Sequence, residues 1–277
     1  MKTILCIGAH PDDNELCVGG TAAQWAVAGN RVHFVSVTNG DRGHFASEYI
    51  ANPQLLAERR LGEAIAAAGV IGATYQTLGI RDGEVYVDKA ATEAMVRCIR
   101  TCGEPGKGPD LVIFNRPQDY HRDHRYTSQL VTDASYMLTV PTLCPEIPHL
   151  LRMPVFAYWH DSFKDMVPFR PDVIVPIDAV MDTKTRMVAE HESQVFEWLP
   201  YNHAAGGEVS VPAGKEERIA WLKAALQARD GARRADVAAA RPSAEIASAC
   251  VEAFQLCEYG TRPSLADLQN LFPSTAI

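Results

Sequence analysis

The sequence predicts a single-domain, Rossmann-like α/β fold, in which helices cover both faces of a mainly parallel sheet to give three α/β/α layers. Short apolar runs alternate with helical patterns along the chain, as they do where crossover helices join parallel strands. The 277 residues suffice for one large α/β domain. No composition shift, repeat or low-complexity tract marks a boundary, so the expected domain spans 1–277.

Each element has its own signal in the sequence. Apolar runs rich in Val and Ile predict strands at 2–9, 31–38, 73–79, 111–115, 155–160 and 173–178. Apolar residues at helical spacing, with Gly29 and Gly69 as stop signals, predict the helices. These helices are expected at 16–28, 51–69, 88–101, 124–138, 182–198, 214–233 and 243–256.

Two further segments are expected at the periphery. Residues 199–214 carry Pro and Gly and form a candidate lid loop. Residues 260–277 form a C-terminal docking tail, whose apolar residues from Leu265 to Phe272 suit a short helix.

The composition excludes several classes of partner. A net charge of −8 with scattered basic residues argues against nucleic acid and anionic membranes. No apolar stretch is long enough to span a membrane, and the first residues lack a signal-peptide cleavage site. The seven cysteines, an odd number placed mostly in apolar segments, are typical of reduced thiols. We expect a cytoplasmic protein that takes a small-molecule substrate and is able to form a homo-oligomer.

A first polar cluster follows the strand 2–9. His10, Asp12, Asp13 and Glu15 come directly after it, at the sheet edge where open α/β folds bind ligands. Imidazole and carboxylate groups are typical zinc ligands, and a second carboxylate can take a proton from a metal-bound water. The alternative is a polar turn that caps the next helix, for which Glu15 is the best candidate.

A second cluster follows the strand 111–115. It contains His121, Asp123 and His124, with Asp119 just upstream, again between a strand and a helix. Carboxylates beside imidazoles fix the ring tautomer and raise basicity. Because both clusters lie at the carboxyl ends of parallel strands, they predict one metal site at a shared sheet edge.

With these clusters in place, the sequence resembles the LmbE-like, or PIG-L, family of zinc-dependent N-acetyl sugar deacetylases. Five blocks between Ile4 and about Val195 carry the resemblance, in family order. They are HPDDNELCVGG, VTNGDRGH, RRLGEAIAAAGV, PQDYHRDH and KTRMVAEHESQV. One departure is Arg122, which stands where the family usually has Pro and is expected to add a cation near the pocket.

The resemblance implies a role for each residue of the clusters. His10, Asp13 and His124 would bind Zn²⁺, although the same ligands accept another divalent cation such as Fe²⁺. Asp12 would be the general base.

From the second cluster, His121 would stabilise the oxyanion or protonate the leaving amine, and Asp123 would orient the His121 ring. Arg60 matches a pocket arginine of the family and is a candidate substrate contact; the alternative is an ion pair on the helix surface. Asp41, Arg42 and His44 follow the strand 31–38 and are expected on the same rim, either as substrate contacts or as a solvated turn.

The expected function is that of a metal-dependent hydrolase. It would remove an N-acetyl group from an amino sugar or an N-acetylglucosamine conjugate and release acetate and a free amine. One alternative is a zinc amidase acting on a thiol conjugate or another non-sugar amide, and a less favoured one is a non-catalytic ligand-binding module. A dinucleotide site is not supported, because Gly19-Gly20 fits neither the Rossmann nor the Walker pattern.

Overall fold

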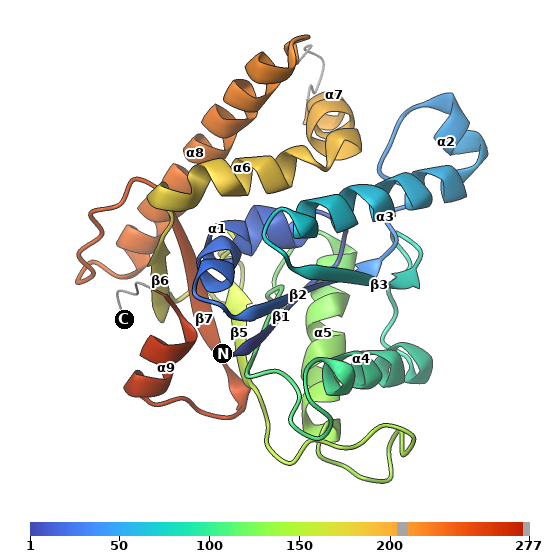
Figure 1. Cartoon of the computed structure of the whole chain (residues 1–277), viewed down its shortest axis with the longest axis vertical. Coiled ribbons are helices and arrows are strands. Elements are labelled where there is room, and N and C mark those ends of the chain that lie inside the picture. The colour runs from blue at the N-terminus through green and yellow to red at the C-terminus, as the bar shows by residue number, and fades with distance from the viewer. Residues whose placement is uncertain (204–209, 274–277) are drawn as a thin grey trace.

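The computed structural model describes residues 1–203 and 210–273 and contains one seven-stranded sheet (Figure 1). The strand order is β3-β2-β1-β4-β5-β7-β6. The first five strands in this order, from β3 to β5, pair in parallel, whereas β7 runs antiparallel to both β5 and β6. The strands are β1 (Thr3–Gly8), β2 (Arg31–Thr38), β3 (Thr74–Ile80), β4 (Leu111–Phe114), β5 (Val155–Trp159), β6 (Val173–Pro176) and β7 (Val251–Gly260).

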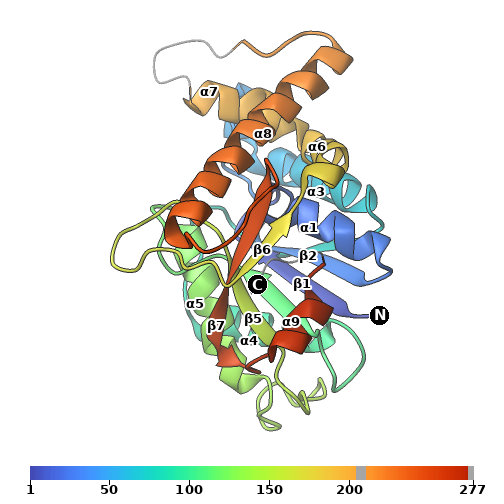
Figure 2. The same cartoon turned by 90° about the vertical axis from the view of Figure 1, so that its left-hand side faces the viewer.

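Helices cover both faces of the sheet (Figures 1 and 2). The first face carries α1 (Asp13–Val27), α3 (Pro53–Gly69), α6 (Met181–Ala189) and α8 (Lys215–Ala240), and α9 (Leu265–Leu271) packs on the same core. The opposite face carries α4 (Lys89–Thr101) and α5 (Arg122–Met137). Four short helical segments complete the described part of the chain: α2 (Ser47–Ala51), a 3₁₀ turn (Asp178–Val180), a π-helical segment (Ser193–Trp198) and α7 (Leu199–His203). The predicted three-layer, mainly parallel fold is confirmed.

Alternation along the strands fills the core on both sides. In β1, Ile4 and Cys6 face the first core, whereas Leu5 and Ile7 face the second, and all four are fully buried. A strand buried on both faces reads as a continuous apolar run, which is why the central strands could be located from the sequence.

The prediction of a helix over 243–256 is wrong. Residues Val251–Gly260 form β7, which pairs with β5 on one side and β6 on the other. Its Ala and Glu residues have weak strand propensity, but two-sided pairing and burial decide the outcome. Glu252 is fully buried, and its carboxylate accepts hydrogen bonds from the backbone of Gly20 and Thr21 on α1.

Two other predictions change in detail. The helix expected over 182–198 is interrupted, because α6 ends at Ala189 and a π-helical segment, Ser193–Trp198, follows. The candidate lid loop at 199–214 begins as helix α7, and its residues 204–209 lie outside the described part of the chain. The docking helix predicted in the C-terminal tail is present as α9, where Leu268 and Leu271 are buried.

No helix within the described residues is both long and apolar enough to cross a membrane.

A buried ionic cluster ties α6, α8, β7 and α1 together. The Lys184 ammonium lies 2.8 Å from Asp230 Oδ2 and 2.9 Å from Glu252 Oε1, and all three side chains are fully buried. Arg233 Nη1 lies 3.0 Å from the other Asp230 oxygen. Charges of both signs therefore neutralise one another where α1 approaches its neighbours.

We predict that Lys184→Met destabilises the protein strongly, because it leaves two buried carboxylates short of a partner. Breaking a buried pair by removing one member typically costs about 3–5 kcal/mol. Urea unfolding followed by circular dichroism measures the change. Lys223→Met is the matched control, because that lysine pairs with exposed Asp182 on the surface. Equal stability of the two variants would contradict the prediction.

Candidate active site

The two sequence clusters meet at the carboxyl ends of β1 and β4. These strands are neighbours, and the chain leaves β1 toward β2 but reaches β4 on the other side. Such a switch point creates a crevice outside the sheet edge, where α/β folds bind ligands. The loop after β1 carries His10 to Asp13, and the loop after β4 leads into α5 through His121.

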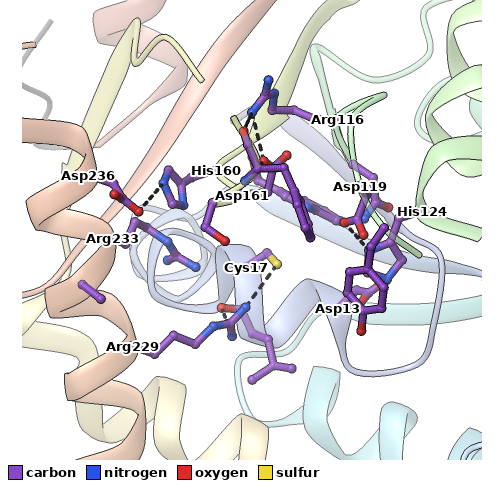
Figure 3. A pocket seen from close by; sticks show the side chains of 17 residues that line it. Asp13, Cys17, Arg116, Asp119, His124, His160, Asp161, Arg229, Arg233 and Asp236 are labelled. Atoms are coloured by element: carbon purple, nitrogen blue, oxygen red, sulfur yellow. Dashed lines mark hydrogen bonds and ion pairs between the residues drawn. The ribbon is translucent and has the colours of Figure 1, made fainter. Parts of the chain in front are cut away.

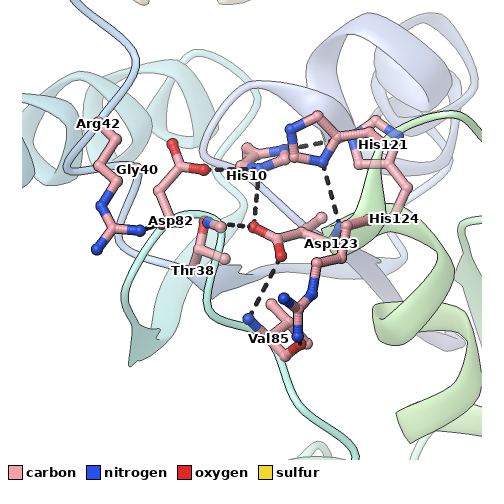
Figure 4. Close-up of polar contacts among 12 residues, drawn as sticks. His10, Thr38, Gly40, Arg42, Asp82, Val85, His121, Asp123 and His124 are labelled. Atoms are coloured by element: carbon pink, nitrogen blue, oxygen red, sulfur yellow. Dashed lines mark hydrogen bonds and ion pairs between the residues drawn. The ribbon is translucent and has the colours of Figure 1, made fainter.

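The side chains of His10 and of His124, on the first turn of α5, face each other (Figure 4), and Asp13, at the start of α1, joins them. His10 Nδ1 lies 3.2 Å from His124 Nε2, and Asp13 Oδ2 lies 3.7 Å from the former and 3.5 Å from the latter. Bonds of about 2.0–2.2 Å to a tetrahedral cation would hold ligand atoms roughly 3.3–3.6 Å apart. The donor set and its spacing therefore fit a divalent metal such as zinc.

The backbone makes this convergence sterically possible. Asp13 Oδ2 accepts hydrogen bonds from the backbone N–H groups of Ala9 and His10. A Cβ atom on Gly8 would lie 2.6 Å from the Asp13 Cβ, so the last residue of β1 must be glycine for the carboxylate to sit there. Charged imidazoles and these hydrogen bonds outweigh burial and lower the pKa of Asp13.

The other nitrogen of His10 faces a second pair of carboxylates. His10 Nε2 lies 3.3 Å from Asp82 Oδ1 and 3.5 Å from Asp123 Oδ2. His10 therefore belongs to two groups of potential metal ligands. One group also contains His121 and His124, and the other contains Asp82 and Asp123. Burial disfavours the charged ring, but the three surrounding carboxylates raise the pKa of His10 well above its usual range. This concentration of negative charge favours a cation.

Asp82, which lies in the loop after β3, is not among the site residues predicted from the sequence. Burial raises the pKa of the Asp82 carboxyl, but the hydrogen bond and charge of His10 outweigh burial and lower it to about 2. The sequence signal for Asp82 is its position just after a predicted strand, at the same sheet edge as both clusters.

Asp12 is held in a strained backbone conformation, with φ of 130°. A non-glycine residue at such a φ costs energy and often marks a functional site. The residue is 8% exposed, and burial raises the pKa of the carboxyl although Arg60 opposes the shift. A carboxylate with a raised pKa is a better proton acceptor at neutral pH.

Arg60 is buried, so the interpretation as a surface ion pair is wrong. Its guanidinium donates to the backbone oxygens of Pro11 and Gly40 and lies 3.3 Å from Asp12 Oδ1. A Cβ on Gly40 would lie 2.4 Å from Arg60 Nη1, which explains the glycine at that position. Arg60 therefore fixes the loop that carries Asp12, besides lining the cavity.

His121 caps the N-terminus of α5. Its Nδ1 accepts the backbone N–H of Asp123, so the neutral ring carries its proton on Nε2. Burial, reinforced by the positive charges of His10 and His124, lowers the pKa of His121. The ring is therefore a neutral hydrogen-bond donor at neutral pH.

Asp123 does not orient the His121 ring as expected. Its carboxylate accepts the backbone N–H groups of Gly83 and Val85 and faces His10 Nε2. The second residue of a helix points away from the N-cap side chain, which turns Asp123 toward the β3–α4 loop. Asp119 instead supports His124, the predicted metal ligand on α5, since its Oδ2 lies 2.8 Å from His124 Nδ1.

The side chains open into a cavity of about 420 Å³. Of the predicted substrate contacts, Arg42 and Arg60 line it, but Asp41 and His44 do not. Asp41 accepts hydrogen bonds from Arg81 Nε and the Asp82 backbone, and His44 Nε2 lies 2.8 Å from Glu197. Both brace the rim of the cavity, so their assignment as substrate contacts is corrected.

Two more expectations fail because side chains point elsewhere. Glu15 does not cap α1; it is fully buried, 3.2 Å from His191 Nε2. Arg122 adds no cation to the cavity. Its guanidinium stacks between the rings of Tyr86 and Tyr126 and donates to the Val85 carbonyl, so it anchors the β3–α4 loop.

Comparisons with known proteins agree with this architecture. The family model "PIG-L: GlcNAc-PI de-N-acetylase" matches residues 5–135. A diacetylchitobiose deacetylase of Thermococcus kodakarensis is 29% identical over 216 residues, covering 73% of this chain and 75% of the relative. A 1D-myo-inositol 2-acetamido-2-deoxy-alpha-D-glucopyranoside deacetylase of Rhodococcus opacus is 34% identical over 280 residues, covering 83% of this chain and 94% of the relative.

The fold also occurs with a different activity. The crystal structure of a 4-carboxy-2-hydroxymuconate hydratase from Pseudomonas putida superposes with a TM-score of 0.66 at 21% identity. The superposition covers 96% of this chain and all of the other. Fold alone therefore does not decide the reaction.

Fold and site together define an α/β protein with a cluster of histidine and carboxylate side chains at the switch point of its sheet. The chain belongs to the PIG-L family.

We predict that Asp119→Asn weakens zinc binding about 10–100-fold, the usual effect of removing a carboxylate that orients a ligand histidine. Competition with a chromogenic chelator measures the affinity without requiring turnover. The control is Asp133→Asn, on the exposed side of α5. Unchanged zinc affinity in Asp119→Asn would show that His124 is not a ligand held by this contact.

Proposed function

We propose that this protein is a zinc-dependent N-deacetylase that acts on an amino sugar or an N-acetylglucosamine conjugate. One observation carries the proposal: His10, Asp13 and His124 converge within 3.7 Å, beside a buried carboxylate on Asp12 and in one cavity. The printed activities of the two deacetylase relatives support the same substrate class.

The ligand set would hold the metal through two imidazole nitrogens and one carboxylate. A bound divalent cation supplies a Lewis acid that polarises a carbonyl and lowers the pKa of a coordinated water. Fe²⁺ is compatible with the same ligands, so the metal used in the cell is a separate measurement.

The chain's own residues supply the proton transfers. Asp12 accepts a proton from the attacking water, whose oxygen forms a bond to the acetamide carbon. His121 donates its Nε2–H hydrogen bond to the negative charge that develops on the carbonyl oxygen. The carbon–nitrogen bond then breaks, the proton held by Asp12 passes to the amine nitrogen, and acetate and a free amine leave.

The surrounding contacts keep these groups in place. Arg60 holds the strained loop of Asp12 through the Pro11 carbonyl, and Asp119 fixes the His124 ring. Asp82 and Asp123 together hold the far side of His10. Such support is what keeps a site within the small tolerance that catalysis needs.

A substrate panel distinguishes the proposal from its alternatives. The purified, zinc-loaded protein is incubated with N-acetylglucosamine, diacetylchitobiose, an N-acetylcysteine conjugate and a 2-hydroxymuconate, and acetate and amine are measured. Release of acetate from the sugars supports the proposal. Release from the cysteine conjugate alone favours a non-sugar amidase, and hydration of the muconate without acetate release would refute deacetylation.

We predict that Asp12→Asn and His124→Ala fail in different ways. Asp12→Asn lowers kcat at least about 100-fold, in line with the loss of a general base, but still binds zinc. His124→Ala loses zinc, because a ligand is missing. Activity assays paired with metal analysis by mass spectrometry check both variants. Near-native turnover by Asp12→Asn would overturn the assignment of the base.

A further inference from the structure

A second cavity of about 370 Å³ adjoins the first one at the ligand set (Figure 3). It lies between the end of β5, the loop after β4 and helix α8. Five residues line both cavities: Asp13, Leu16, Tyr120, His124 and Arg229. A molecule with its acyl group at the ligand set can therefore extend past Arg229 into the second cavity.

Most charged groups of the second cavity are already paired. Asp161 Oδ1 lies 2.9 Å from Arg116 Nη1, and the two Asp236 oxygens lie 3.8 Å from His160 and 3.7 Å from Lys164. The remaining carboxylates there, Asp13 and Asp119, contact the histidines of the predicted metal site.

Arg229 differs from these groups. Within the described ranges, no carboxylate oxygen lies within 4.0 Å of its guanidinium, which donates only to the Leu16 carbonyl and, at 3.8 Å, to Cys17 Sγ. The side chain is exposed at the junction of the two cavities. An exposed guanidinium retains donors arranged for bidentate binding of a carboxylate or a phosphate.

Other positively charged groups lie at the second cavity besides Arg229. Arg233, one turn further along α8, also lines it; its Nη1 is bound to Asp230, while its buried Nε has no partner among the described residues. Burial, followed by the charges of Arg233, Arg116 and Arg229, lowers the pKa of His160 to about 3. Burial raises the pKa of Asp161 to about 6 although Arg116 opposes the shift, so its carboxylate stays mostly ionised at neutral pH and is neutralised by Arg116.

We propose that the second cavity is a subsite for an anionic group on the part of the substrate beyond the acetamido sugar, and that Arg229 binds this group. The inference rests on the proposed function and adds the substrate's charge to it. A carboxylate and a phosphate share the chemistry that Arg229 recognises, so the experiment includes both.

The test compares three N-acetylglucosamine derivatives with the same anomeric configuration. They are the neutral methyl glycoside, the carboxymethyl glycoside, which carries a carboxylate, and the 1-phosphate. The ratio of kcat/KM for each anionic compound to that for the neutral one is measured in the zinc-loaded protein and its variants. We expect at least one ratio to fall about tenfold in Arg229→Met, since one hydrogen-bonded charge pair contributes about a factor of ten or more. Arg229→Lys should restore part of it.

Lys223→Met is the matched control, because it removes one positive charge from the same helix, at a residue outside both cavity linings. It should leave the ratios unchanged. The subsite is overturned if both anionic compounds give the same ratios in Arg229→Met as in the wild type. In that case, turnover of the methyl glycoside still supports deacetylation. If none of the three compounds is deacetylated, the proposed function is overturned, and the subsite with it.

Discussion

The structure depends on how His10 is held from both sides. One ring nitrogen meets His124 and Asp13, and the other meets Asp82 and Asp123. Buried carboxylates at this density repel one another unless a cation lies among them, whether a charged imidazole or a metal ion. The strained turn at Asp12, the glycine at the end of β1 and the buried Arg60 all serve this crowded arrangement.

The fold brings these groups together through its topology. Parallel pairing of β1 with β4 places two loops more than a hundred residues apart at one switch point. The β3–α4 loop adds Asp82 and the backbone donors that turn Asp123, and α8 closes the far side with Arg229. The predicted metal site and a neighbouring charged cavity thus share one sheet edge.

Much of the fold could be predicted from sequence, because central strands buried on both faces and helices ended by glycine leave local signals. The strand β7 could not, since its pairing with β5 and β6 is non-local. In the site, residue types at strand ends indicated that His10, Asp13 and His124 would come together. Orientation was beyond local patterns: Asp123 faces His10 rather than His121, Arg122 stacks on Tyr86, and Asp82 enters from a third loop.

The most direct test of the central claim is a crystal structure of the zinc-loaded protein with anomalous scattering recorded at the zinc edge. We predict one anomalous peak, at about 2.0–2.2 Å from each of His10 Nδ1, an Asp13 carboxylate oxygen and His124 Nε2. A peak on the opposite face of His10, between Asp82 and Asp123, or a zinc ion bound away from both loops, would contradict it.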